Sequence, residues 1–321
     1  MKKDLLLIGG ATPRMMDAFA ANFTVHEVSK IKNLETFLAE NGNKIEAVAT
    51  NGHDGVNPEI MDALGNLKII SCYGVGYDAI DAKAAVERDI IVTHTPDVLN
   101  NDVANTTILL MLAVSRRLIR DDAWVRSGNW QAKGNAPLTT SIEEKKVGIL
   151  GLGRIGETIA KKLGAFGCVI SYHSRNKKSD ANYKYYSNLV EMAKEVDYLV
   201  VITPGGPATY HLVNREVMDA LGPEGTLINV ARGSVVDEVE MVKALQEGRL
   251  GNAGLDVFEK EPIVPKELFT MENVVLTPHV ASATVETRRA MGDRTVDNLV
   301  KFFSEGKVIS PIPECAGMAV T

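Results

Sequence analysis

The sequence predicts an α/β protein built from two doubly wound domains with parallel sheets. Short apolar runs rich in Val and Ile alternate with helical patterns along the chain, which is typical of βαβ units. A length of 321 residues exceeds what one ordinary core supports. Near residue 151 a glycine-rich turn between an apolar run and a helical pattern begins a second series of such units. Together these observations predict two α/β domains.

The expected elements follow the apolar periodicity. Strands are expected at 5–8, 47–49, 69–71, 90–92, 147–150, 169–172, 198–202, 226–230 and 274–277. Helices are expected at 33–40, 57–64, 155–165 and 239–247. One long helix is expected from about Asp102 to Ser127, ended by Gly128, and a last one from about Val285 to Phe303. The last helix has no strand left to follow, so it can return to the first domain.

Composition excludes several classes of protein. A net charge of −6 argues against a general affinity for nucleic acid or an anionic membrane surface. No apolar run approaches the roughly 18–20 residues of a membrane span, and we expect a cytoplasmic protein. The three cysteines, Cys72, Cys168 and Cys315, are widely spaced and match no disulfide framework or zinc motif. They are expected to be buried small hydrophobic residues, and no metal site is expected.

The turn at Gly151, Gly153 and Gly156 has the GxGxxG spacing between a strand and a helix. The first glycine permits a tight turn, the second lets the backbone approach a pyrophosphate, and the third allows close packing of helix on strand. The N–H groups at the start of the helix, from Arg154 and Ile155 onward, can bind phosphate. An incidental strand-to-helix turn is the alternative. We predict a dinucleotide site.

A dinucleotide-binding domain begins at its first strand, which here starts at Val147 and is preceded by the long helix. The predicted dinucleotide-binding domain therefore covers 100–286. The other domain covers 1–99 together with 287–321.

The strand after the glycine turn runs into a basic stretch that contains Ser174, Arg175 and Lys177, with no acidic residue before Asp180. In such folds an acidic residue here binds the ribose 2′-hydroxyl of NAD, whereas arginine accommodates the 2′-phosphate of NADP. A guanidinium can hold a phosphate bidentately, and a serine hydroxyl can donate to it. A solvated basic loop is the alternative reading. The sequence predicts that NADPH is preferred over NADH.

Three polar residues, Arg232, Glu261 and His279, follow predicted strand ends, where doubly wound folds place ligands. Each alone has an ordinary explanation: a surface ion pair, a turn residue before proline, or a histidine bound by backbone groups. Together they suit the reduction of a 2-oxo acid. Arginine binds the substrate carboxylate, and histidine donates a proton to the carbonyl oxygen. A neighbouring carboxylate favours the protonated ring and fixes its orientation.

The chain resembles the D-isomer-specific 2-hydroxyacid dehydrogenase family over essentially its whole length. The motifs that carry the resemblance are 147–156, 229–238, 254–262 and 278–284. The family implies a Rossmann dinucleotide-binding domain and a flavodoxin-like substrate-binding lid. It also implies that Arg232 binds the carboxylate and polarises the carbonyl, that Glu261 tunes the histidine, and that His279 is the acid in reduction and the base in oxidation.

The resemblance implies further cofactor contacts. Asp256 would hold the nicotinamide end, and Thr203, Pro204, Val230 and Ala231 would border it.

The same resemblance assigns roles to the first domain and the long helix. The backbone N–H groups of Val75 and Gly76 would bind the substrate carboxylate, as a glycine-rich turn allows, with a simple strand-to-helix turn as the alternative. His53 is a candidate substrate contact. The helix and arm over 102–130, with Trp130, resemble the family's dimerisation element, so we expect a homodimer.

Within the family, the stretch 172–178 is similar to NADPH-preferring glyoxylate/hydroxypyruvate reductases and to hydroxyphenylpyruvate reductases. Glyoxylate and hydroxypyruvate are the expected substrates, and hydroxyphenylpyruvate or another 2-oxo acid is the alternative. The chain ends soon after its last helix, which argues against a phosphoglycerate dehydrogenase with a regulatory extension. A nucleotide-sensing corepressor is the alternative from another class, because fold alone does not determine function.

Overall fold

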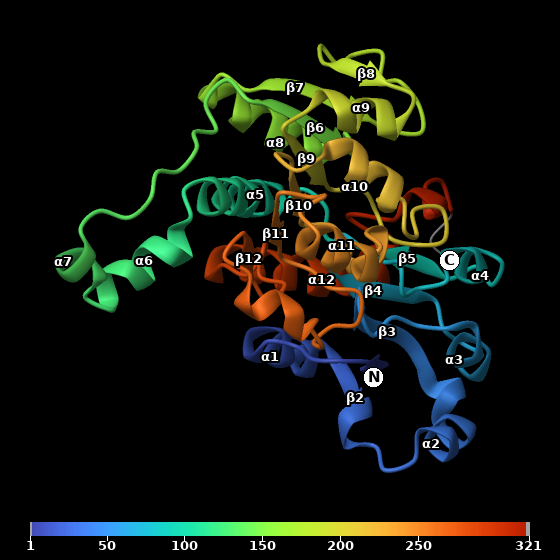
Figure 1. The fold of residues 1–321 in the computed structure, drawn as a ribbon. Coiled ribbons are helices and arrows are strands. Elements are labelled where there is room, and N and C mark those ends of the chain that lie inside the picture. The colour runs from blue at the N-terminus through green and yellow to red at the C-terminus, as the bar shows by residue number, and fades with distance from the viewer. Residues whose placement is uncertain (1, 319–321) are drawn as a thin grey trace. The chain divides into compact units, whose positions relative to one another are not determined.

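The computed structural model describes residues 2–318 (Figure 1). It divides into two compact units: a terminal unit, made of 1–99 and 284–321, and a central unit, made of 100–283. Each unit is a parallel sheet with helices, so the predicted fold class is confirmed. The sequence placed the second boundary after residue 286, whereas the last helix begins at Val285, with Thr284 as its cap.

The sheet of the terminal unit has five parallel strands in the order β2-β1-β3-β4-β5, which is the flavodoxin-like order. Its strands are β1 (Lys3–Leu7), β2 (Phe23–Glu27), β3 (Ile45–Asn51), β4 (Ile69–Tyr73) and β5 (Ile91–Thr93). Side chains alternate between the two faces: Leu5 and Leu7 join one core cluster, and Leu6 joins the other. Both faces are therefore covered by helices.

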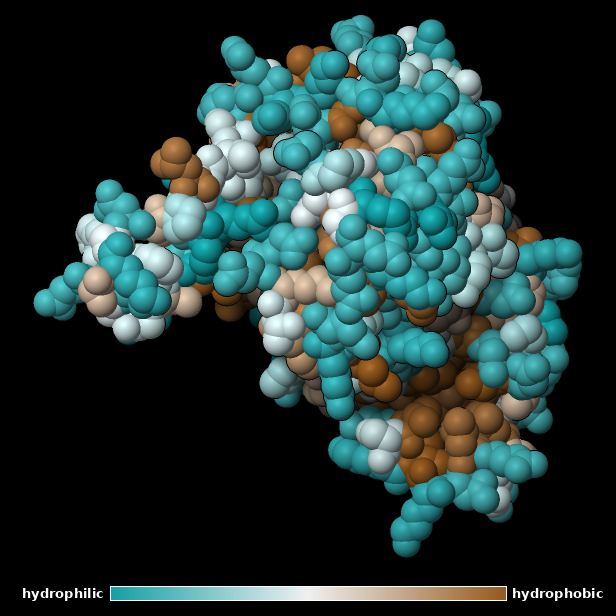
Figure 2. Space-filling view, viewed as in Figure 1, coloured by the Kyte–Doolittle hydropathy of each residue, from teal (hydrophilic) through white to brown (hydrophobic). Residues whose placement is uncertain are grey.

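One face of this sheet carries α1 (Pro13–Asn22) and α12 (Val285–Glu305), and the other carries α2 (Leu34–Asn41), α3 (Pro58–Ala63) and α4 (Ala82–Val86). Polar caps start these helices: the side chains of Thr12, Thr284, Asn33, Asn57 and Asp81 accept backbone N–H groups of the first turns. Figure 2 shows apolar side chains gathered in a hollow between α2 and α3.

The sheet of the central unit has seven parallel strands in the order β12-β11-β10-β9-β6-β7-β8. Its strands are β6 (Lys146–Leu150), β7 (Val169–His173), β8 (Lys184–Tyr186), β9 (Tyr198–Val201), β10 (Thr226–Asn229), β11 (Asn252–Leu255) and β12 (Val274–Leu276). The first strand in the chain, β6, lies between β7 and β9. The strand order reverses there, and doubly wound sheets bind ligands at such a reversal.

Helices cover both faces of the central sheet. One face packs on α9 (Leu189–Glu195), α10 (Arg215–Leu221) and α11 (Glu238–Gln246) through a continuous apolar cluster. On the other face, α5 (Asn100–Ser115) packs beside α8 (Arg154–Leu163). Gly254 on the sheet lets α5 pack closely against it, because a Cβ at that position would lie only 3.1 Å from the Cβ of Leu110 on α5.

The prediction of a single long helix over 102–127 is wrong. The segment forms α5, α6 (Leu118–Arg126) and α7 (Asn129–Lys133). Arg117 breaks the helix with a left-handed φ of 49°. Its guanidinium donates to the carbonyl of Glu272 at 3.1 Å and to Oδ1 of Asn252 at 2.8 Å, which stabilises the break. Figure 1 shows α6 and α7 extending away from the sheet of their own unit.

The three cysteines are buried and not disulfide-bonded, as predicted. Within residues 2–318, no helix combines the length and the apolar character needed to cross a bilayer.

Candidate active site

All strands of the central sheet are parallel, so the loops at their carboxyl ends lie along one edge. The glycine turn follows β6, the basic stretch follows β7, and Thr203 follows β9. Arg232 follows β10, the segment with Glu261 follows β11, and His279 follows β12. The candidate cofactor loops and the candidate catalytic loops therefore lie on opposite sides of β9.

The geometry of the glycine turn fits a dinucleotide. Gly151 has a φ of +102°, and its Cβ would lie 2.9 Å from the backbone nitrogen of Thr203. A Cβ at Gly156 would lie 2.3 Å from the carbonyl oxygen of Gly151. At Gly153, by contrast, a Cβ would meet nothing within 4 Å, and no side chain caps the helix that begins there. A helix start without a side-chain cap, beside a glycine that faces open space, suits the binding of a pyrophosphate.

The segments expected to border the cofactor lie beside this turn. Thr203 and Pro204 follow β9, and the Thr203 backbone packs against Gly151. Val230 and Ala231 are buried directly after β10, the next strand in the sheet.

The basic stretch presents two exposed cations. Arg175 and Lys177 make no hydrogen bond or ion pair in the part of the chain that the structure describes. The Ser174 hydroxyl donates instead to the carbonyl of Asn176 at 2.7 Å. To donate to a phosphate, as predicted, the Ser174 hydroxyl must give up its hydrogen bond to Asn176. Lys178, for which no role was predicted, forms an ion pair with Glu157 on α8.

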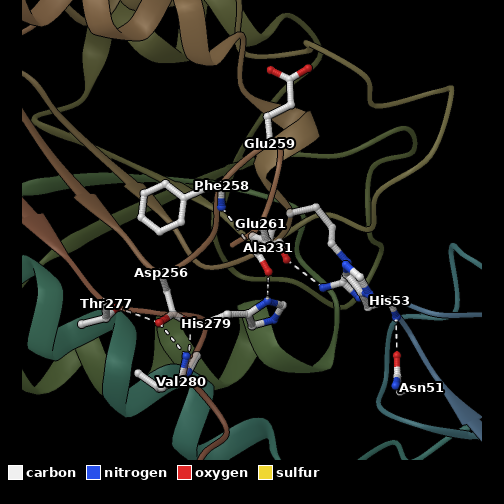
Figure 3. A network of polar contacts seen from close by, with 12 residues as sticks. Asn51, His53, Ala231, Asp256, Phe258, Glu259, Glu261, Thr277, His279 and Val280 are labelled. Carbon is white, nitrogen blue, oxygen red and sulfur yellow. Dashed lines mark hydrogen bonds and ion pairs between the residues drawn. The ribbon is translucent and has the colours of Figure 1, made fainter. Parts of the chain in front are cut away.

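His279 and Glu261 form a direct pair (Figure 3). Nδ1 of His279 lies 2.7 Å from Oε2 of Glu261, although the two residues are 18 positions apart. His279 has a left-handed φ of 52°, and its N–H donates to the carbonyl of Asp256 at 2.7 Å. Oε1 of Glu261 accepts the Phe258 N–H at 3.0 Å. With Nδ1 occupied, Nε2 is the ring nitrogen left for a ligand.

The surroundings of Glu261 favour its charged form over its protonated form. Burial acts to raise the pKa of Glu261. Hydrogen bonds from His279 and from the Phe258 N–H, together with the positive charges of His279 and Arg232, more than offset this effect. The net pKa of Glu261 therefore lies below its ordinary value, and the residue is a carboxylate throughout the neutral range.

Asp256 anchors the histidine loop. The residue is fully buried, and its Oδ1 accepts the Thr277 hydroxyl at 2.6 Å and the Val280 N–H at 2.9 Å. Its Oδ2 accepts the Ala281 N–H at 2.9 Å. Figure 3 shows Thr277 and Val280 directed at this carboxylate. Thr277 is a site residue without a predicted role, although a threonine beside Pro-His after a strand was a usable signal in the sequence.

Arg232 lies in a turn that Asn229 holds. The Asn229 side chain donates to the carbonyl of Arg232 at 3.0 Å and accepts the Ala231 N–H at 3.1 Å. Nη1 of Arg232 donates to the Ala231 carbonyl at 2.8 Å. The positive charge of Arg232 acts on Glu261 and contributes to lowering its pKa, so Arg232 is coupled electrostatically to the pair of Glu261 and His279. Asn229, which is buried, was part of a recognised motif but had no assigned role.

The candidate substrate loop of the terminal unit follows β4. Gly74 has a φ of +152°, and the Val75 carbonyl accepts the Nδ1–H of His94 at 3.0 Å. The N–H groups of Val75 and Gly76 donate to no acceptor within residues 2–318. His53 is exposed, and its N–H donates to Oδ1 of Asn51 at 2.8 Å.

Among the residues that the structure describes, no group of three or more His, Cys, Asp or Glu side chains is arranged to hold a metal ion.

The fold and the loops at the carboxyl edge together define a dinucleotide-dependent oxidoreductase. Residues 108–281 match the model of the D-isomer specific 2-hydroxyacid dehydrogenase, NAD binding domain. The chain belongs to the D-isomer-specific 2-hydroxyacid dehydrogenase family and is an NAD(P)-dependent enzyme. The predicted resemblance is confirmed.

Named relatives are similar over most of the chain. A hydroxyphenylpyruvate reductase of Plectranthus scutellarioides is 52% identical over 276 residues, or 86% of this chain and 88% of that protein. A glyoxylate/hydroxypyruvate reductase A of Arabidopsis thaliana is 52% identical over 275 residues, with the same coverage. The structure of an NADPH-dependent glyoxylate/hydroxypyruvate reductase from Sinorhizobium meliloti, in complex with NADP and malonate, has a TM-score of 0.91, 42% identity and 98% coverage of both chains.

Proposed function

We propose that this enzyme reduces glyoxylate or hydroxypyruvate to the D-2-hydroxy acid with NADPH, and that Arg232, Glu261 and His279 are its catalytic residues. The observation that carries the proposal is the 2.7 Å pair of His279 and Glu261 beside the charge of Arg232. The names of the plant relatives and of the Sinorhizobium structure support the substrate class.

The proposed mechanism uses these three side chains. When bound, NADPH supplies the hydride that reduces the carbonyl carbon. Arg232 binds the substrate carboxylate through its fork of donors and polarises the carbonyl. Nε2 of His279 donates a proton to the carbonyl oxygen as negative charge develops there. The Glu261 carboxylate stabilises the imidazolium that makes this donation, and the roles reverse in oxidation.

The cofactor preference is proposed from Arg175 and Lys177, which carry two exposed positive charges at the end of β7. Gly151, Gly153 and Gly156, with the N–H groups of Arg154 and Ile155, are proposed to bind the pyrophosphate. A kcat/KM with NADH equal to or above that with NADPH would contradict this preference.

Asp256 is proposed to hold the nicotinamide end of the cofactor, with Thr203, Pro204, Val230 and Ala231 bordering it. Its buried carboxylate also anchors the histidine loop, because it accepts three hydrogen bonds there. For the terminal unit we propose substrate binding through the N–H groups of Val75 and Gly76.

Hydroxyphenylpyruvate is the second candidate substrate, because a relative with 52% identity is named for its reduction. The test is NADPH oxidation with a panel of glyoxylate, hydroxypyruvate, hydroxyphenylpyruvate and pyruvate. We expect the highest kcat/KM with glyoxylate or hydroxypyruvate. Turnover of hydroxyphenylpyruvate alone would select the second candidate, and turnover of none would contradict the proposed activity.

We further propose a homodimer that assembles through 102–130, and a cytoplasmic location. Exposed apolar side chains on α6 and α7, among them Leu118, Ile119 and Trp130, support the dimer. Three buried cysteines without a disulfide fit a reducing compartment.

A further inference from the structure

Two tyrosines hold the two ends of the basic stretch 174–178. Tyr172 lies on β7 and is among the largest fully buried side chains of the described chain. Its hydroxyl accepts the backbone N–H of Lys178 at 2.9 Å. Tyr185 lies on the neighbouring strand β8, and its hydroxyl donates to the carbonyl of Ser174 at 3.2 Å. The two rings pack together, with their centroids 5.3 Å apart.

These contacts determine what the stretch presents to a ligand. Between the two anchored ends, Arg175 and Lys177 are exposed. The N–H groups of Arg175, Asn176 and Lys177 have no acceptor within the described residues. Anchoring both ends therefore fixes a short stretch that carries two cations and three N–H groups without an acceptor, which are the donors that a phosphate needs.

A hydroxyl that orders this turn lowers the entropic cost of binding a phosphate there. Neither tyrosine hydroxyl is placed to donate to the phosphate itself. Tyr172 is fully buried, and the Tyr185 hydroxyl donates its only proton to the carbonyl of Ser174. Their effect on a ligand must therefore pass through the backbone of the stretch. The adenosine of NADH lacks the 2′-phosphate, so its binding does not depend on the same donors.

We propose that Tyr172 and Tyr185 are positioning residues that set the selectivity for the 2′-phosphate, and hence for NADPH over NADH. The inference rests on the proposed NADPH preference and adds the residues that pre-organise it. If the tyrosines only stabilised the β7–β8 edge, their loss would weaken the binding of both cofactors alike, or change only the melting temperature.

The test uses the full-length enzyme with Tyr172→Phe and Tyr185→Phe, which remove only the hydroxyls. Tyr183→Phe is the matched control, because Tyr183 lies beside β8 and its hydroxyl has no hydrogen bond in the described chain. We expect KM for NADPH to rise about three- to tenfold in each variant, the effect of one neutral hydrogen bond, while kcat and KM for NADH stay within about twofold of wild type.

A binding measurement without turnover gives a second readout. By calorimetry, the Kd of 2′,5′-ADP should rise by a similar factor in both variants, whereas the Kd of 5′-AMP should stay unchanged. In an Arg175→Ala background the tyrosine substitutions should have a smaller effect than in the wild type, because one of the groups that they position is gone.

Equal weakening of 2′,5′-ADP and 5′-AMP, or no change in either, would overturn the inference. Tyr185→Phe keeps the test decisive if Tyr172→Phe does not fold, because Tyr185 is only partly buried. Failure of the cofactor preference and failure of the tyrosine role give different results. A wild-type enzyme that prefers NADH contradicts the proposed cofactor, whereas a wild-type preference for NADPH that survives both substitutions contradicts only the role of the tyrosines.

Discussion

At the scale of single residues, the pair of His279 and Glu261 depends on an unusual backbone. A left-handed φ of 52° at His279 is uncommon for a residue with a side chain. The buried Asp256 carboxylate stabilises it by accepting the N–H groups of Val280 and Ala281, while the His279 N–H donates to the Asp256 carbonyl. These backbone hydrogen bonds fix the position from which the His279 ring reaches Glu261.

Replacing the histidine should remove the proton donor. We expect His279→Ala to lower kcat with hydroxypyruvate by about 10²–10⁴-fold, with little change in the Kd of NADPH. The matched control is His26→Ala, because His26 lies in another histidine–carboxylate pair, 2.6 Å from Asp4. Steady-state kinetics and cofactor titration measure both effects. Near wild-type turnover in His279→Ala would show that the proposed mechanism is wrong.

Glu261 should couple stability to pH. Its folded-state pKa lies below the ordinary value, so its contribution to stability is complete above the pKa of the unfolded chain and is lost as pH falls through the folded pKa. We therefore expect the difference in Tm between wild type and Glu261→Gln to be largest near about pH 7 and to shrink toward about pH 3. Thermal unfolding across this range measures it, and a constant difference would contradict the assignment.

The same substitution should alter activity. Without the carboxylate, Nδ1 of His279 loses its partner at 2.7 Å, so the ring that donates the proton is no longer held in place. We expect kcat with hydroxypyruvate to fall by about 10²-fold or more in Glu261→Gln. Steady-state kinetics measure this loss, and an unchanged kcat would mean that Glu261 does not act through the histidine.

At the scale of elements, the glycine turn separates packing from ligand binding. Gly151 and Gly156 are needed because the chain passes close to itself, whereas Gly153 faces open space. The glycines needed for packing and the glycine that faces the ligand side all lie in the short segment from the end of β6 into the first turn of α8. Substitutions within this turn should therefore have different consequences.

We expect Gly156→Ala to destabilise the enzyme by about 1–3 kcal/mol, because its Cβ would lie 2.3 Å from the Gly151 carbonyl oxygen. Gly153→Ala should leave Tm nearly unchanged but raise the Kd of NADPH by about tenfold, since its Cβ would lie where the pyrophosphate approaches. Thermal unfolding and NADPH fluorescence titration measure the pair. The explanation fails if Gly153→Ala loses stability while keeping its affinity for NADPH.

At the scale of the whole molecule, the segment 118–138 of the central unit carries exposed apolar side chains. Leu118, Ile119, Val125, Trp130 and Leu138 are 50%, 62%, 56%, 60% and 98% exposed. Several large apolar side chains exposed on one segment are typical of an interface. The break at Arg117 turns this segment away from α5, so it has little apolar surface of its own unit to pack on.

A second copy of the chain is the proposed partner of this segment. Sedimentation at about micromolar concentration should give a dimer for the wild type, and Leu138→Asp together with Trp130→Ala should shift it toward the monomer. Val239→Asp, at an exposed valine on α11, is the matched control and should remain dimeric. A monomeric wild-type enzyme would contradict the proposed assembly.

Several features were determined by the sequence alone because their signals are local. The GxGxxG spacing, the basic residues after β7 and the alternation of strands and helices each lie within one short window. Strands β2, β8 and β11 escaped prediction because they lack a continuous apolar run: β2 (FTVHE) and β8 (KYY) contain polar residues, and β11 (NAGL) carries Asn and Gly. Sheet pairing with β10 and β12 makes β11 a strand.

The rest was decided by tertiary structure, because it depends on hydrogen bonds between residues far apart in the chain. The sequence could name Glu261 and His279, but only the fold brings them to 2.7 Å. Arg117 ends the long helix through a contact with Asn252, 135 positions away. The tyrosines that hold the basic stretch lie on two paired strands, and no spacing along the chain reveals that each hydroxyl meets the backbone of the same turn.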